Sequence, residues 1–88
     1  MKFSSLDDFY KSVGELTAAL EAQGFKGEAQ GIRVLMHEVA WTTGSELLGE
    51  LDLQFSRMKG RYPEHIAVWI QACHDFAKNH RRILGLDP

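Results

Sequence analysis

The chain has 88 residues, of which 44% are apolar and 25% charged, a composition typical of one soluble globular domain over residues 1–88. Its net charge of −2 gives no reason to expect nucleic acid or an anionic membrane as a partner. One cysteine excludes an intramolecular disulfide, and no leading apolar segment or run of about 20 apolar residues occurs, so we expect a cytoplasmic protein.

The first predicted helix runs from about Ser5 to Gln23. Ser5 and Asp8 resemble a capping box in which Asp takes the place of the usual Glu. Apolar residues then recur at three- and four-residue steps and form one core-facing stripe. Gly24 supplies the left-handed residue that commonly ends a helix. The stripe consists of Leu6, Phe9, Tyr10, Val13, Leu16, Thr17 and Leu20.

Three more helices are expected, from residue 27 or 28 to 41, from 44 to 59 and from 63 to 85. Pro63 suits the first turn of the last helix, because its missing N–H would have been unpaired there. No segment alternates with the period of two that marks a strand. The stripes are Ile32, Leu35, Met36 and Val39 in the second helix, Leu47, Leu48, Leu51, Phe55 and Met58 in the third, and Ile66, Trp69, Ile70, Cys73, Phe76, Ala77, His80 and Leu84 in the fourth.

The links between these helices are short, at residues 24–26, 41–44 and 60–62, and such links normally join antiparallel neighbours. The predicted fold is therefore all-α, a compact four-helix antiparallel bundle. The alternative is a small, less regular helical array in which the second and third helices meet at a steep angle.

Three glycines, Gly14, Gly31 and Gly49, lie inside predicted helices, where each costs roughly 0.8–1.0 kcal/mol relative to alanine. They could serve as hinges or as points where a ligand reaches the backbone. We favour the simpler interpretation that they mark close helix contacts or leave space for a bulky ring.

Charged residues are distributed unevenly along the chain. Up to Gln54 there are nine acids and four bases, and from Phe55 onward there are three acids and six bases. The late bases form either an anion- or RNA-binding patch or two groups of cations that each close a helix, and the helix dipole favours the second interpretation. If the last two helices are antiparallel, the groups fall at opposite ends of the molecule. They are Arg57, Lys59 and Arg61, and Lys78, Arg81 and Arg82.

The sequence carries no catalytic motif. It has no Gly-rich phosphate loop, no nucleophile elbow and no zinc spacing of paired cysteines. His37 and Glu38 begin a metalloprotease-like pattern, but Trp41 stands where the second histidine is required. We therefore expect neither an enzyme nor a cofactor.

A small-ligand or metal-binding helical protein is the alternative function, with a pocket near Trp69, Cys73, His74 and His80. Cys73 and His80 share the apolar face of the last helix, where both are also explained as core residues. His74 points to another side of that helix, so a third zinc ligand is missing and no metal is expected.

Several apolar residues fall outside the predicted stripes. Val34 and Trp41 project opposite the stripe of the second helix, with His37 beside them, and Leu53 lies off the stripe of the third. One interpretation is that the second helix is buried on both sides, or that Trp41 turns under the start of the third helix. The other is that these residues form a surface for a protein partner or a second copy, with Trp41 as its aromatic anchor.

The segment WTTGSELLGEL, residues 41–51, is interpreted as a helix end followed by a capped restart, because Thr43 and Glu46 have capping-box spacing. The longer run HEVAWTTGSELLGEL resembles the centre of small uncharacterised bacterial helical proteins. This resemblance implies a bacterial origin and a helical fold, and it transfers no activity and no site residue.

These observations favour a small non-enzymatic cytoplasmic protein that acts as a protein–protein interaction or regulatory module. The expected partner is another protein or a second copy in a homodimer, and neither nucleic acid nor a membrane is expected. The expected binding residues are Trp41, Val34, His37 and Leu53.

Overall fold

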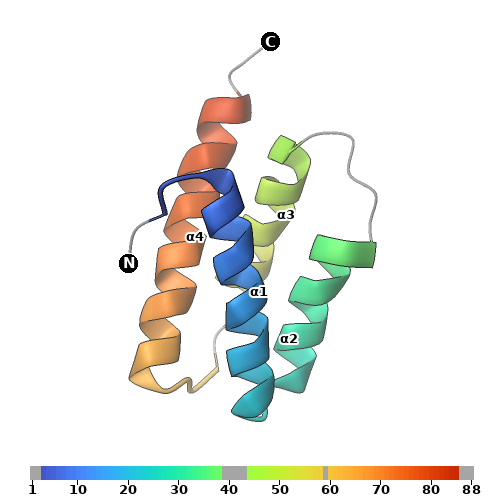
Figure 1. Cartoon of the computed structure of the whole chain (residues 1–88), viewed down its shortest axis with the longest axis vertical. Helices are drawn as coiled ribbons and strands as arrows, with labels where there is room; N and C mark the ends of the chain where they lie inside the picture. The colour runs from blue at the N-terminus through green and yellow to red at the C-terminus, as the bar shows by residue number, and fades with distance from the viewer. Residues whose placement is uncertain (1–2, 39–43, 59, 86–88) are drawn as a thin grey trace.

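The computed structural model describes residues 3–38, 44–58 and 60–85, and in this part of the chain every regular element is helical (Figure 1). The prediction of an all-α fold is confirmed. The elements are the α-helices α1 (Leu6–Ala22), α2 (Lys26–Arg33), α3 (Gly44–Ser56) and α4 (Glu64–Gly85), and the π-helical turn η1 (Val34–Glu38) that continues α2.

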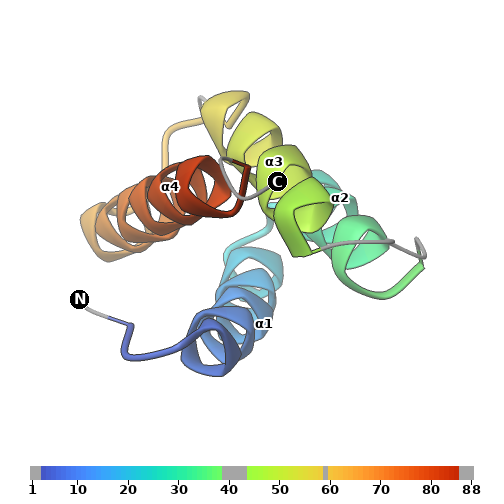
Figure 2. The same cartoon turned by 90° about the horizontal axis from the view of Figure 1, so that it is seen from above.

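Successive helices run in opposite directions and stand at the corners of a four-sided bundle (Figures 1 and 2). Each helix packs against two others: α1 against α2 and α4, and α3 against α4 and α2. The most extensive packing is between α3 and α4, whereas α2 and α3 meet over a narrow contact. The arrangement is the predicted four-helix antiparallel bundle, built from an α1–α2 hairpin and an α3–α4 hairpin.

The core lies where the four apolar stripes meet, as their spacing predicts. Thr17 is the buried polar side chain among them, and its hydroxyl donates to the carbonyl oxygen of Gly14 at 2.6 Å, which satisfies it without leaving the helix. The buried apolar residues are Phe9, Val13, Leu16 and Leu20 from α1, Ala29 and Ile32 from α2, Leu48, Leu51 and Phe55 from α3, and Ile66, Ile70, Cys73 and Ala77 from α4.

Both predicted ends of α1 are confirmed. At its start, the Ser5 hydroxyl accepts from the backbone N–H of Asp8 at 3.1 Å. At its end, Gly24 has φ +91°, and the N–H of Phe25 donates to the carbonyl oxygen of Leu20 at 2.9 Å. Together with the bond from the N–H of Gly24 to the carbonyl oxygen of Glu21 at 3.1 Å, this bond forms a Schellman motif, which turns the chain back into α2.

The second predicted helix differs most from expectation. It begins at Lys26, but from Val34 to Glu38 it is π-helical, and its predicted end at residues 39–41 lies outside the described residues. Bonding from residue i to i+5 widens each turn, so the 100° spacing used for the prediction fails beyond Arg33. Val34 and Met36, predicted on opposite sides, are consequently both half-buried.

The two later helices start or end within a few residues of the predicted positions. The third ends at Ser56 instead of residue 59, and the fourth starts at Glu64. Pro63 therefore precedes the helix, and its carbonyl oxygen accepts from the N–H of Ala67 at 2.9 Å. Arg57 and Arg61 belong to the connection between α3 and α4, whereas residues 78–82 lie toward the other end of α4, so the described bases of the two groups are at opposite ends of the molecule, as predicted for antiparallel helices (Figure 1).

The glycine interpretation is wrong at Gly14, which is exposed with nothing within 4 Å of where a Cβ would stand. It is confirmed at Gly31, because a Cβ there would meet the Gln54 amide of α3 at 2.8 Å. This small residue thus belongs to the narrow contact between α2 and α3.

Candidate ligand-binding hollow between α3 and α4

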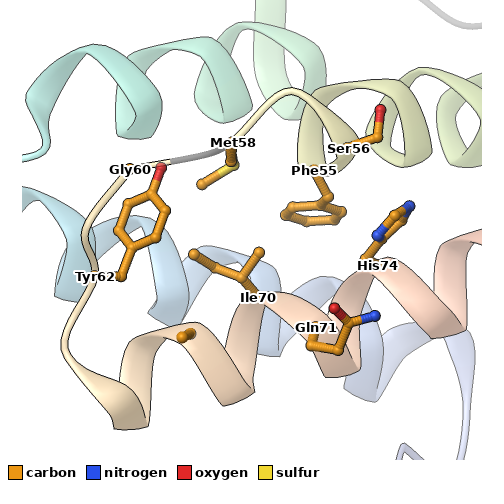
Figure 3. A pocket seen from close by; sticks show the side chains of 9 residues that line it. Phe55, Ser56, Met58, Gly60, Tyr62, Ile70, Gln71 and His74 are labelled. Carbon is orange, nitrogen blue, oxygen red and sulfur yellow. The ribbon is translucent and has the colours of Figure 1, made fainter.

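A hollow of about 550 Å³ lies where α3 ends and α4 begins (Figure 3). Its size falls within the range of roughly 300–1,000 Å³ that is usual for ligand sites. The residues that line it come from α3, from the connection that follows, and from the first half of α4. We call this the α3–α4 hollow, and its lining residues are Phe55, Ser56, Met58, Gly60, Tyr62, Ala67, Ile70, Gln71 and His74.

The floor of the hollow is apolar. Phe55 and Ile70 are core residues of α3 and α4 whose side chains approach each other from the two helices (Figure 3). Met58 and Tyr62, both half-buried, extend this floor toward the connection. An apolar side chain placed here would gain about 25 cal/mol for each Å² removed from water.

The α4 wall follows from helical spacing. Ala67, Gln71 and His74 are four and then three residues apart, so they share the side of α4 that faces α3. Ala67 offers only a methyl group and is exposed, which leaves the space in front of it open. A larger side chain at this position would fill the hollow.

Polar side chains at the rim already have partners. The Nε2–H of His74 donates to the Asp52 carboxylate of α3 at 2.8 Å, and this hydrogen bond connects α4 to α3. The Gln71 amide donates to Asp75 at 2.9 Å along the same helix. The Ser56 hydroxyl donates to the carbonyl oxygen of Leu53 at 2.8 Å. The rim is thereby ordered by its own hydrogen bonds.

Tyr62 fixes the end of the hollow nearest the connection. Its ring packs on Phe25 with centroids 4.7 Å apart, and its hydroxyl donates to the Glu28 carboxylate at 3.3 Å. Burial, followed by the negative charge of Glu28, raises the pKa of Tyr62, so the phenol stays neutral and remains a donor. The ring also lies against Gly60, where a Cβ would stand 3.0 Å from it.

In the segment that follows α3, residues that line the hollow alternate with basic residues. Residues 56, 58, 60 and 62 line the hollow, while the three residues between them are basic. Arg57 and Arg61 are exposed, and neither forms an ion pair with any described residue. Lys59 lies outside the described residues. Arg57 and Arg61 are thus sequence neighbours of lining residues and do not themselves line the hollow.

The residues predicted to bind a partner are only partly described. Trp41, the predicted anchor, lies outside the described residues, Val34 is half-buried and His37 is exposed. Leu53 is 43% exposed and points outward from α3, because Asp52 before it faces α4 and Gln54 after it faces Gly31 of α2. A common surface that includes Trp41 stays a prediction.

Of the four residues of the predicted alternative pocket, Trp69 and Cys73 both lie against α1. The Trp69 indole N–H donates to the Ser12 hydroxyl of α1 at 2.8 Å, and Cys73 is fully buried on that side of α4. His80 stacks on Phe76 with centroids 3.7 Å apart, and its Nδ1–H donates to the Phe76 carbonyl oxygen at 3.1 Å.

His74 is the one of these four residues that lines the α3–α4 hollow. Among the described residues, no group of three or more His, Cys, Asp or Glu side chains is placed to hold a metal ion. The structure therefore separates His74 from Trp69 and Cys73, and ligand binding by these residues stays a prediction.

Most of the hollow is not predicted from the sequence. The predicted third helix includes Met58, and the predicted site residues do not include Ala67, Gln71 or Tyr62. The one signal in the sequence was the alternation of bases with other residues over 57–61, which departs from helical spacing.

Comparison with protein-family models, curated proteins and solved structures gave no significant match for this chain. The resemblance of residues 37–51 to small bacterial proteins therefore stays a prediction. In the described part of the chain, no helix has both the length and the apolar character needed to cross a membrane.

Proposed function

We propose that this protein is a small non-enzymatic cytoplasmic interaction module, and that the α3–α4 hollow receives an apolar side chain of a partner protein. The observation that carries the proposal is the apolar floor formed by Phe55, Met58 and Ile70, open to solvent beside Ala67. Interaction sites commonly take a large side chain into such a pocket and surround it with polar groups.

The chemistry of the nucleophilic side chains supports a non-enzymatic role. Burial raises the pKa of the Cys73 thiol to about 12, so it is neither accessible nor ionised near neutral pH. Within the hollow, the Ser56 hydroxyl already donates to a backbone carbonyl group and His74 is bonded to Asp52. No activated nucleophile faces the hollow among the described residues.

Site-specific photo-crosslinking tests the proposal. Gln71, an exposed residue at the rim of the hollow, is replaced by a benzophenone amino acid in the producing cell, and the matched control carries it at Ala18, which is also exposed but lies on α1. We expect one protein to be crosslinked from position 71 and not from position 18. The partner, purified separately, should then bind the wild-type protein and lose at least about tenfold in affinity for Ala67→Phe, about 1.4 kcal/mol.

Helical circular dichroism and the unfolding midpoint of Ala67→Phe establish that the variant is folded. If the purified partner binds Ala67→Phe as well as it binds the wild-type protein, the hollow is not the site. If no protein crosslinks at position 71, the proposal fails.

The small-ligand function predicted as the alternative is favoured by the volume of the hollow. Native mass spectrometry of the freshly purified protein tests it directly. A bound small molecule that disappears in Ala67→Phe but persists in Ala18→Phe would support the alternative over a protein partner.

A further inference from the structure

We propose that the partner side chain in the α3–α4 hollow is a tryptophan, and that its indole N–H donates to Nδ1 of His74. This inference rests on the proposed function and specifies the side chain that the partner contributes. The indole ring lies on the apolar floor near Phe55 and Ile70, and its N–H is directed at the wall formed by α4.

His74 presents a hydrogen-bond acceptor to the hollow. Its Nε2–H donates to the Asp52 carboxylate, which can only accept, and in a neutral imidazole the other ring nitrogen is then an acceptor. This Nδ1 has no hydrogen-bond partner in the described structure. Figure 3 shows the second ring nitrogen on the side of Phe55, within the lining of the hollow. A side chain that reaches the floor therefore meets an acceptor that the protein itself does not use.

The other polar side chains of the lining direct their donors at the protein itself. The Gln71 amide donates to Asp75, and the Ser56 hydroxyl donates to a backbone carbonyl group of α3. The Tyr62 hydroxyl donates to Glu28. Each of these three groups retains an oxygen that can accept, whereas Gln71 alone retains a further N–H. The polar side chains of the hollow thus offer more acceptors than donors, which favours a partner group that donates.

Tryptophan matches this lining better than the other large apolar side chains. Its N–H is a donor without any acceptor, and a buried indole usually requires a hydrogen-bond partner, as Trp69 of this chain finds in Ser12. Phenylalanine or leucine would cover Nδ1 of His74 and leave it unpaired, which weakens binding. A hollow of about 550 Å³ also has room for the two fused rings, and tryptophan is a frequent anchor of protein interfaces.

Peptide selection tests the inference while the partner itself is still unidentified. A phage library of random twelve-residue peptides is selected on the wild-type protein after depletion on Ala67→Phe, whose larger side chain fills the hollow. We expect Trp in the peptides whose binding depends on the hollow. Selection of Phe or Leu peptides without Trp would overturn the inference and would leave the hollow as a binding site.

An isosteric change in the peptide then isolates the contribution of the N–H. The Trp of the best peptide is replaced by 3-benzothienylalanine, in which sulfur stands in place of the indole N–H. Both peptides are labelled with fluorescein and titrated against the wild-type protein. We expect about a tenfold loss of affinity, because Nδ1 of His74 loses its donor while the apolar area is kept. A loss below about twofold would overturn the inference.

Titration of the same two peptides against His74→Phe identifies the acceptor. This variant keeps an aromatic ring but lacks Nδ1, so the two peptides should bind it within about twofold of each other. The matched control is His65→Phe, the same substitution at an exposed position of α4 that does not line the hollow, and it should keep the tenfold difference. A tenfold difference that persists in His74→Phe would place the acceptor elsewhere and overturn the inference.

A measurement on the wild-type protein keeps the test independent of how His74→Phe folds. In ¹⁵N-labelled protein, the Nδ1 resonance of His74 should move when the Trp peptide is added, because the nitrogen gains a hydrogen bond. The sulfur-containing peptide should move it much less. An equal movement with both peptides would show that the indole N–H is not bonded to His74.

The outcomes separate this inference from the proposed function. Equal binding of the Trp peptide and its isostere overturns the inference alone. If every enriched peptide binds Ala67→Phe and wild type alike, the hollow does not bind peptides and both proposals fail. Concentration-dependent dimerisation that Ala67→Phe abolishes would identify a second copy as the occupant, and binding of free indole without peptide binding would identify a small ligand; either result overturns the inference.

Discussion

Tyr62 and Phe25 pack ring against ring, with centroids 4.7 Å apart and planes inclined by 56°, although they belong to different helical hairpins. Phe25 follows the Schellman turn that ends α1, and Tyr62 lies in the connection between α3 and α4. Both connections are at the same end of the bundle (Figure 1). This aromatic pair adds a contact between the hairpins to the packing of α1 on α4, and Tyr62 also lines the hollow.

Removing the Tyr62 ring should therefore affect stability and binding together. We expect Tyr62→Ala to lower the free energy of unfolding by about 1–3 kcal/mol, because the half-buried ring loses its packing on Phe25. Tyr62→Phe keeps the ring and loses only the 3.3 Å hydrogen bond to Glu28, so it should cost less than about 1 kcal/mol. Urea unfolding of both variants measures the difference, and equal losses would show that the ring packing contributes little.

Alanine substitution at two glycines should change the free energy of unfolding in opposite directions. Gly14 lies within α1 in open space, so Gly14→Ala should raise the free energy of unfolding by about 0.5–1 kcal/mol through helix propensity. Gly24 has φ +91°, a conformation that costs an alanine roughly 1–2 kcal/mol, so Gly24→Ala should lower stability by about that amount. Thermal unfolding should move the midpoints in opposite directions, and a shared direction would contradict the local geometry at one of them.

The aromatic cluster of Phe3, Phe9 and Phe76 lies toward the other end of the bundle, and we expect it to contribute a large part of the free energy of unfolding. Phe9 is fully buried and stacks on Phe76 with centroids 4.4 Å apart, while Phe3 packs edge-on against it at 5.5 Å. We expect Phe9→Ala to cost about 3–5 kcal/mol, a large part of the stability of a small domain. Leu53→Ala, at a position 43% exposed, is the matched control and should stay within about 0.5 kcal/mol. Similar losses for the two variants would mean that the core is not organised around Phe9.

The bundle could be predicted from the sequence because the apolar spacing and the terminating residues of a helix are local sequence patterns. Phe9, Val13, Leu16 and Leu20 recur with the helical period, and Gly24 places the turn, so local patterns suffice to define α1 and its direction. The π-helical turn was not predicted, since its wider spacing has no periodic signature in five residues.

The hollow is a different kind of feature, because it depends on how two helices meet. Ala67 and Gln71 resemble ordinary surface residues in the sequence, and only the approach of α3 makes them a wall. Cys73 and His74 are neighbours in the chain but about 100° apart on α4, so one faces α1 and the other faces α3. Helical spacing already predicts that His74 points to another side of α4 than Cys73, but it does not say which helix each side meets.

The single cysteine offers a test of this packing that needs no ligand. Burial raises the pKa of Cys73 from its usual value of 9.0 to about 12, and a hydrogen bond with Ser12 only partly opposes the shift. The thiolate is the reactive form, so at pH 8 the native protein should react with a disulfide reagent only through transient opening. We expect labelling at least about a hundredfold slower than in 8 M urea, the conditions under which the side chain is exposed. Rapid labelling of the native protein would place Cys73 outside the core.

The same shift predicts how stability changes in alkali. Between pH 9 and pH 12 the folded state keeps the Cys73 proton while the unfolded state releases it, so the free energy of unfolding should fall as pH rises through this window. Below pH 9 both states hold the proton, and this contribution is undiminished. Tyr10 and Tyr62 add a loss of the same sign, because burial raises the pKa of each above 10.0. Cys73→Ala retains both tyrosines, so its stability should fall less steeply than that of the wild-type protein between pH 9 and pH 12, whereas parallel curves would show that the thiol is not protected by the fold.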